Sequence, residues 1–184
     1  FPDTNKNKRK FIEEVNLLFY RNQIAFKLNE EGKIERIIPK ELNNILYKNF
    51  NTIDEELNKL LSEATEYIIK PKVEDRKRAL ERLWDAFERI KSLYGDNKRK
   101  SSQKLIELVS KENELLEEYL NDESTTLTKI GNKFNIRHYE TNTQSVNEII
   151  HIDYLFFRLY SLMILFLTGI EINNWRIRGW KEMF

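Results

Sequence analysis

One apolar segment limits what this chain of 184 residues can fold into. Residues 154 to 170, YLFFRLYSLMILFLTGI, approach the length of a membrane span, but they include Arg158 and several polar groups. We therefore favour the most buried helix of a bundle, or a dimer interface, over a membrane span. A buried guanidinium is costly unless it is paired, so Arg158 needs a carboxylate partner. The candidates are Asp85, Glu88, Glu140 and Asp153.

Most of the chain has the spacing of amphipathic helices, and only five glycines and three prolines interrupt it. Helices are predicted for residues 8–21, from Pro39 onward, from Thr52 to Pro71, and for 73–94, 105–120, 124–134 and 147–170. The stretch GDNKRKSSQK at 95–104 is predicted to be a basic loop. One segment differs, because IAFKLNEEGKIERII at 24–38 alternates apolar and polar residues around Gly32, which predicts a β-hairpin.

These elements predict a mainly α fold, in which a helical bundle follows a small helix–β-hairpin–helix module. The expected boundaries are 1–50 for the N-terminal module, 51–172 for the bundle and 173–184 for an aromatic, basic C-terminal tail. In the tail, Trp175 and Trp180 are suited to anchor a partner, and packing on the protein's own bundle is an equal alternative.

Composition excludes several classes of function. Lysine and arginine number 31 against 30 aspartates and glutamates, so any contact with nucleic acid must come from a local basic patch. The absence of cysteine excludes disulfides and thiolate chemistry, suits a cytoplasmic location, and with only two histidines argues against a zinc site. No phosphate-binding glycine loop, HExxH, EF-hand or G-x-S-x-G motif occurs, so no cofactor and no metal are expected.

The segment NIRHYE at 135–140 contains the best candidates for catalysis: Arg137, His138 and Glu140. Histidine can accept and donate a proton near neutral pH, arginine can bind a phosphate through two hydrogen bonds, and a carboxylate can orient the imidazole. Together they could cleave RNA without a metal. The alternative is a polar loop whose side chains cap helix ends or pair with one another. His151, the other histidine, fits a helix terminus better than a catalytic role.

Three ordered blocks resemble HEPN-domain proteins of the bacterial abortive-infection type. They are RALERLWDAFERIKSLYGDNKRKSSQKLIE (78–107), LTKIGNKFNIRHYETNTQ (127–144) and DYLFFRLYSLMILFL (153–167). The stretch VNLLFYRNQIAFKLNEEGKIERII (15–38) is similar to the helix–hairpin module that precedes the bundle in AbiJ-like members. The resemblance covers roughly residues 11 to 168. It implies a HEPN-like bundle of several helices that commonly forms a homodimer.

The resemblance also implies an activity, because many members are metal-independent endoribonucleases in antiphage defence, toxin–antitoxin systems or RNA processing. Their composite site lies at the dimer cleft, and its usual signature is an arginine followed, after four to six residues, by a histidine. This chain departs from that signature: no arginine stands at that distance before either histidine, and Lys133 is the only such cation before His138. Members that have lost the motif serve as non-catalytic scaffolds or RNA-binding modules.

Two functions are therefore expected from the sequence. The first is a ribonuclease with His138 as general acid and base, Arg137 as phosphate ligand and Glu140 as orienting group, supported by Arg158 and Asp85. Its expected phosphate-binding patch consists of Lys98, Arg99, Lys100 and Lys104. The second is a non-enzymatic module that binds a protein or RNA. The expected partners are RNA, a second copy of the chain, and a further protein or neighbouring domain, with no membrane.

Overall fold

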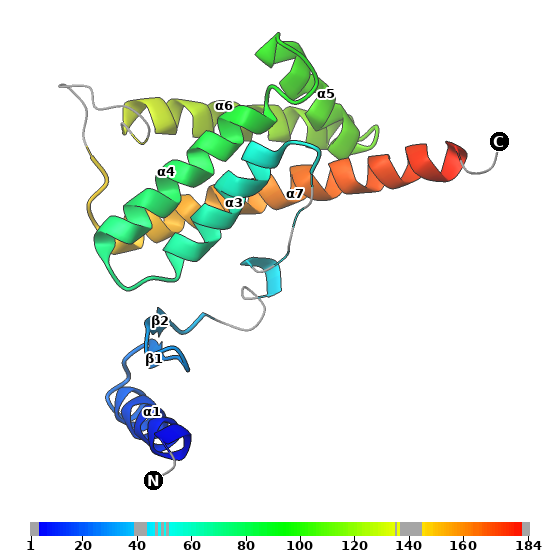
Figure 1. Ribbon diagram of the computed structural model, residues 1–184. Coiled ribbons are helices and arrows are strands. Elements are labelled where there is room, and N and C mark those ends of the chain that lie inside the picture. Colours follow the sequence, from blue (N-terminus) through cyan, green and yellow to red (C-terminus); the bar gives the residue numbers. More distant parts are fainter. Residues whose placement is uncertain are drawn as a thin grey trace.

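The structure is a computed structural model that describes residues 4–38, 44–46, 48, 50, 52–134, 136 and 145–181, with the backbone alone for 174–181. Its elements are α1 (Thr4–Arg21), β1 (Phe26–Leu28), β2 (Ile34–Arg36), α3 (Glu55–Ile68), α4 (Val73–Ile90), α5 (Lys98–Ser110), α6 (Glu114–Lys133) and α7 (Ile149–Lys181). The chain is mainly helical, with one two-stranded sheet among the described residues (Figure 1), as the sequence predicts.

The bundle is built from α3 to α7. Helices α3 and α4 lie side by side, α7 packs along α4 and against α5, and α6 packs against α5 (Figure 1). The apolar faces of these helices meet in one core, whose largest fully buried side chains include Trp84, Phe87, Phe156 and Phe166. Burial of these aromatic and aliphatic side chains is the main force that holds the bundle together.

Helix α7 contains the long apolar segment. By length and composition, Ile149–Asn173 could cross a membrane, but 56% of its most apolar stretch is buried inside the protein, as in the core helix of a bundle. Arg158 lies on this helix and pairs with Glu123 of α6, with distances of 2.8 Å and 2.7 Å between guanidinium nitrogens and carboxylate oxygens. Of the predicted partners of Arg158, Glu140 lies outside the described residues. The other three were wrong, because Asp85, Glu88 and Asp153 pair with Arg82, Lys91 and Arg76 instead.

The region between α4 and α6 differs from the prediction in two places. Residues 98–104 are not a loop, because Asn97 caps α5 by accepting a hydrogen bond from the backbone N–H of Lys100. Helix α5 then ends at Lys111 and Glu112, which both have positive φ, of 49° and 65°. No glycine or proline marks this break. The helix predicted for 105–120 is therefore two helices.

Helix α6 is continuous where the sequence suggested two helices. Asn113 caps its start by accepting from the backbone N–H of Leu116. Ser124, predicted to begin a new helix, is instead buried near the middle of α6. Serine is a common helix cap, but Ser124 faces the inside of the protein, whereas Thr125 is exposed. The predicted tail boundary at residue 173 also does not end a helix, since α7 continues to Lys181.

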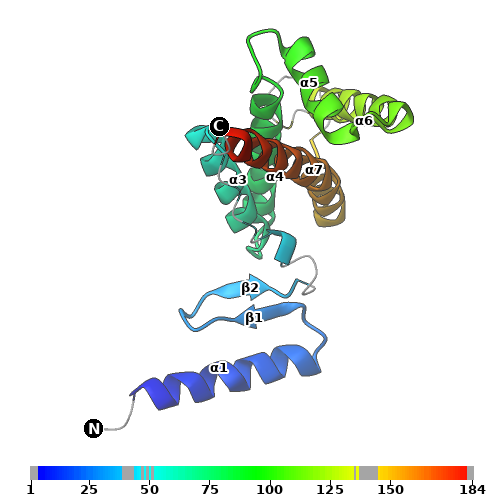
Figure 2. The ribbon, with the colours of Figure 1, turned by 90° about the vertical axis from the view of Figure 1, so that its right-hand side faces the viewer.

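The N-terminal module consists of α1 and the predicted hairpin. Strands β1 and β2 pair antiparallel with Phe26 opposite Arg36 and Leu28 opposite Ile34, and Gly32 in the turn has a φ of 83°. The side chain of Asn16 on α1 fixes the helix to β1, since it accepts from the N–H of Leu28 and donates to its carbonyl. Figure 2 shows that α1 lies on the far side of the hairpin from the bundle.

Two polar contacts attach this module to the bundle. The N–H of Arg36 donates to the carbonyl of Ile69 at 2.9 Å. The guanidinium of Arg36 lies 2.7 Å from a carboxylate oxygen of Asp153 on α7, which also accepts from Arg76 of α4 at 3.0 Å. Asp153 therefore joins three elements, namely β2, α4 and α7.

Candidate functional site

A polar hollow lies between α5 and α6, with a volume of about 540 Å³. Its lining combines cations, hydroxyls and amides and contains no carboxylate among the described residues. The residues are Lys91, Lys98, Arg99, Ser102, Gln103, Asn121, Ser124, Thr125 and Thr128. A lining of cationic and neutral hydrogen-bonding groups favours binding of an anion.

Lys91 forms the deep cationic side of this hollow. It follows the last residue of α4, and its side chain is only 10% exposed. Its ammonium group pairs with Glu88, donates to the Thr128 hydroxyl at 3.0 Å and lies 4.4 Å from the centre of the Phe87 ring. Lys98 approaches the same Glu88 carboxylate at 3.5 Å. One carboxylate thus faces two ammonium groups beside the hollow.

The first turn of α5 supplies the outer cations. Lys98 and Arg99 are exposed there and line the hollow, at the helix end where the peptide dipoles add positive potential. Lys100 and Lys104 are also exposed on α5 but do not line the hollow. The structure therefore divides the predicted basic patch into two residues at the hollow and two outside it.

Ser124 provides a polar group at the α6 side of the hollow. The residue is only 5% exposed, and its backbone carbonyl accepts from the Thr128 hydroxyl at 2.8 Å. Its side chain lines the hollow, where the hydroxyl can donate a hydrogen bond to a ligand.

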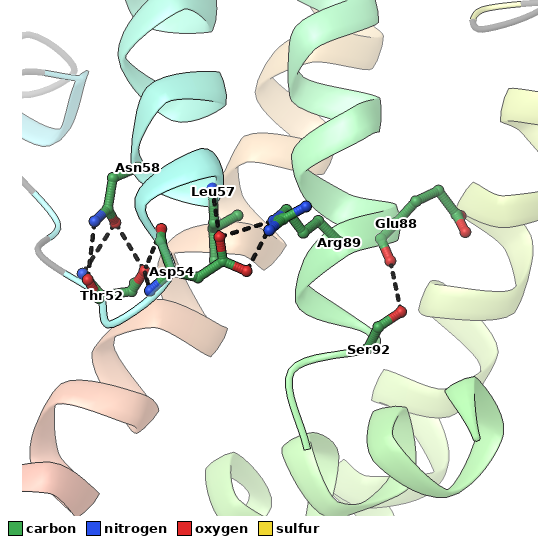
Figure 3. Close-up of polar contacts among 7 residues, drawn as sticks. All are labelled: Thr52, Asp54, Leu57, Asn58, Glu88, Arg89 and Ser92. Carbon is green, nitrogen blue, oxygen red and sulfur yellow. Dashed lines mark hydrogen bonds and ion pairs between the residues drawn. The ribbon is translucent and has the colours of Figure 1, made fainter. Parts of the chain in front are cut away.

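A second and larger hollow, of about 1050 Å³, lies beside the start of α3 and the end of α4. Its lining mixes acids with bases and includes Asp54, Glu55, Glu56, Asp85, Glu88, Arg82, Arg89 and Lys98. Figure 3 shows how Asp54 links the two helices, because its carboxylate accepts from the N–H of Leu57 at 3.0 Å and from Arg89 at 2.8 Å. The mixture of charges makes this hollow a poor polyanion site.

Asp54 is expected to stabilise the protein in a pH-dependent way. Burial opposes ionisation, but the hydrogen bonds from Arg89 and Leu57 prevail and lower the pKa of Asp54. A lowered carboxyl pKa adds stability that is present at neutral pH and is lost as the pH falls through the folded-state value. Asp54→Ala should therefore cost about 1 to 2 kcal/mol at neutral pH, as for other helix caps. Urea unfolding should show this cost shrinking in acid.

Glu55→Ala is the control for that experiment, since Glu55 borders the same hollow and is exposed. It removes one negative charge without removing the cap. The assigned role of the Asp54 carboxylate would be contradicted by either of two results. Asp54→Ala could lower the free energy of unfolding by the same amount as Glu55→Ala, or its effect could be independent of pH.

The predicted catalytic residues Arg137, His138 and Glu140 lie outside the described residues. The described residues that flank them are Ile136, which is 6% exposed, and Ser145. Both line a small hollow of about 130 Å³ together with Lys77, Leu80, Glu81, Phe134 and Val146. Burial raises the pKa of Glu81, so a carboxyl of weakened acidity lies beside this hollow.

The two predicted supporting residues do not pair with each other. Arg158 is held by Glu123, and Asp85 lies 3.7 Å from Arg82 on its own helix. His151 is exposed in the first turn of α7.

Three residues of these hollows are not among those predicted from the sequence: Lys91, Ser124 and Glu81. The sequence does contain a pattern that predicts the α6 side of the hollow. Polar residues recur there at three- and four-residue steps, as on one face of a helix: Asn121, Ser124, Thr125 and Thr128.

Fold and site together define the class of protein: a helical bundle with a cation-lined polar hollow and an appended helix–hairpin module. Comparisons of the chain with protein-family models, with curated proteins and with solved structures find no match.

Proposed function

We propose that this protein binds RNA and cleaves it without a metal ion, as a HEPN-type effector of antiphage defence or of a toxin–antitoxin system. The observation that carries the RNA-binding part is the hollow between α5 and α6, with its three cations and no carboxylate among the described lining residues. The assignment to HEPN proteins is supported by the resemblance of three sequence blocks and by the mainly helical bundle.

In this proposal the hollow binds one backbone phosphate of single-stranded RNA. Lys98 and Arg99 would contact the phosphate from the exposed rim, where long side chains can follow the strand. Ser124 would donate a hydrogen bond from the buried side. Lys100 and Lys104, which are exposed further round α5, would contact neighbouring phosphates.

Cleavage is assigned to Arg137, His138 and Glu140. The imidazole of His138 would take the proton from a ribose 2′-hydroxyl, whose oxygen then attacks the adjacent phosphorus. The bond from phosphorus to the 5′-oxygen breaks, and the leaving oxygen takes up the proton that His138 had accepted. Arg137 would neutralise the pentacoordinate phosphorane, and Glu140 would orient the imidazole. The products are a 2′,3′-cyclic phosphate and a 5′-hydroxyl.

The test is incubation of the purified protein with total RNA in EDTA. We expect cleavage by the wild type and a loss of at least about 100-fold in Arg137→Ala/His138→Ala, as is usual when a general base is removed. His151→Ala is the matched control, because it removes the other histidine, which is exposed, and should leave the rate unchanged. Equal rates for wild type and the double variant would refute the catalytic assignment.

The role of the hollow is tested by the salt dependence of RNA binding. Loss of one phosphate contact lowers the slope of log K against log salt by about 0.7 for single strands. Lys98→Ala/Arg99→Ala should therefore weaken binding and reduce the slope by about 0.7, because both side chains contact the same phosphate. Lys59→Ala/Lys72→Ala removes the same charge from exposed positions elsewhere and should leave the slope nearly unchanged. Equal slopes for the two double variants would contradict the assignment.

A non-catalytic RNA-binding or assembly module is the second candidate. Arg158 pairs with Glu123 and Asp85 pairs with Arg82, so the two predicted supporting residues do not contact each other. This separation favours the second candidate. In that case the salt dependence of RNA binding would be as described above for the wild type and the variants. The folded wild type would, however, leave the RNA intact in EDTA.

A further inference from the structure

The N-terminal module has a large amount of unburied apolar surface. None of the described side chains between Asn5 and Ile38 is buried. On α1, Phe11 is 60% exposed, Leu18 is 56% exposed, and Leu17 and Tyr20 are exposed as well. The hairpin covers only the opposite side of the helix, through Asn16 and its neighbours. Such a concentration of exposed apolar side chains is typical of an interaction surface.

Helix α1 is also strongly basic. Five cations stand against two carboxylates, Glu13 and Glu14, so five minus two gives a net charge of +3. The cations are Lys6, Lys8, Arg9, Lys10 and Arg21. A partner surface for α1 should therefore be apolar and acidic.

The first half of α6 has that complementary character. Leu115 and Tyr119 are 66% and 68% exposed. Between residues 112 and 123 there are six acids and no cation. Glu118 and Asp122 are exposed and lie one helical turn apart, on the same side as the two apolar residues.

The two surfaces cannot meet within one chain. Figures 1 and 2 both show α1 at the opposite end of the molecule from α5 and α6. We propose that α1 of one copy packs on the first half of α6 of a second copy, and that the second copy does the same in return. Two identical contacts related by a twofold axis close the assembly as a dimer. The proposal is independent of RNA binding and of catalysis.

The absence of cysteine makes this contact directly testable. Leu18→Cys and Tyr119→Cys, each exposed in one chain, are made as separate single variants and mixed under oxidising conditions. A disulfide-linked heterodimer should form at least about tenfold faster than for Leu18→Cys mixed with Lys59→Cys, because only the first pair is held together by binding. Equal rates for the two mixtures would overturn the proposal.

Charge reversal gives a second readout, by sedimentation. The wild type should sediment as a dimer, and both Lys10→Glu/Arg21→Glu and Glu118→Lys/Asp122→Lys should shift it toward monomer. A chain carrying all four changes should regain the dimer, since the charges are again opposite. A monomeric wild type, or a dimer that neither charge reversal weakens, would show that α1 and α6 are not partners.

Discussion

Gly131→Ala is expected to lower the free energy of unfolding by about 2 to 3 kcal/mol, the usual cost of overpacking a core. A Cβ at this position would lie 2.1 Å from Nε1 and 2.7 Å from Cδ1 of Trp84. The indole is 1% exposed and surrounded by the core, so it has little room to move away. Thermal unfolding should show a decrease in Tm of about 2 to 4 °C for each kcal/mol in a protein of this size.

The sign of this change is diagnostic. In an open helical position, replacing glycine with alanine stabilises a helix by about 1 kcal/mol. An increase in Tm for Gly131→Ala would therefore show that α6 does not approach Trp84 this closely. Trp84→Phe supplies the control, because phenylalanine lacks the Nε1 that the new Cβ would meet. The double variant should lose clearly less than the sum of the two single changes.

Trp84→Phe also removes an unsatisfied polar group, because Nε1 of Trp84 is a buried donor with no hydrogen-bond partner among the described residues. Removal of an unsatisfied donor offsets part of the cost of the smaller ring.

Asp153→Ala is expected to destabilise the protein by about 3 to 5 kcal/mol, since it leaves a buried guanidinium without its carboxylate. Arg76 is 3% exposed, and burial lowers its pKa, an effect that Asp153 opposes. The same substitution removes the ion pair that Arg36 of the N-terminal module makes with the bundle. Urea unfolding followed by circular dichroism measures the loss.

Two further variants make the result interpretable. Glu66→Ala breaks the exposed pair with Lys70 and should change the stability by less than about 1 kcal/mol. Arg76→Met/Asp153→Leu removes both buried charges and should recover much of the loss, because apolar side chains of similar size need no partner. A cost for Asp153→Ala no larger than that for Glu66→Ala would mean that Arg76 is satisfied in another way.

The strongest periodic patterns predicted the elements that form the bundle and the hairpin. The apolar face of α4, with Leu83, Trp84 and Phe87, is buried as expected, and Gly32 lies in the hairpin turn. The start of α5 differs from the prediction because a run of charges is typical of a loop, whereas the Asn97 cap and the buried Ser101 decide the local structure. The break at Lys111 and Glu112 carries no local signal, since neither residue favours a positive φ.

The sequence predicts only those residues of the candidate site that stand in a run of charged residues. Lys98 and Arg99 stand in an obvious basic run, but Lys91 and Ser124 belong to helices whose other residues form the core. Their place in the hollow depends on how α4, α5 and α6 pack, which no single segment encodes. Arg158 illustrates the same limit, because its partner Glu123 could be identified only once α6 was known to lie against α7.

The contact between Arg36 and Asp153 also bears on the order in which the protein is made and folded. The two residues are 117 positions apart, and Asp153 belongs to the last helix of the described chain. During synthesis, α1 and the hairpin leave the ribosome long before α7 exists to receive them. The ion pair that attaches the hairpin to the bundle can therefore form only after α7 has been made, so docking of the N-terminal module is a late step of folding.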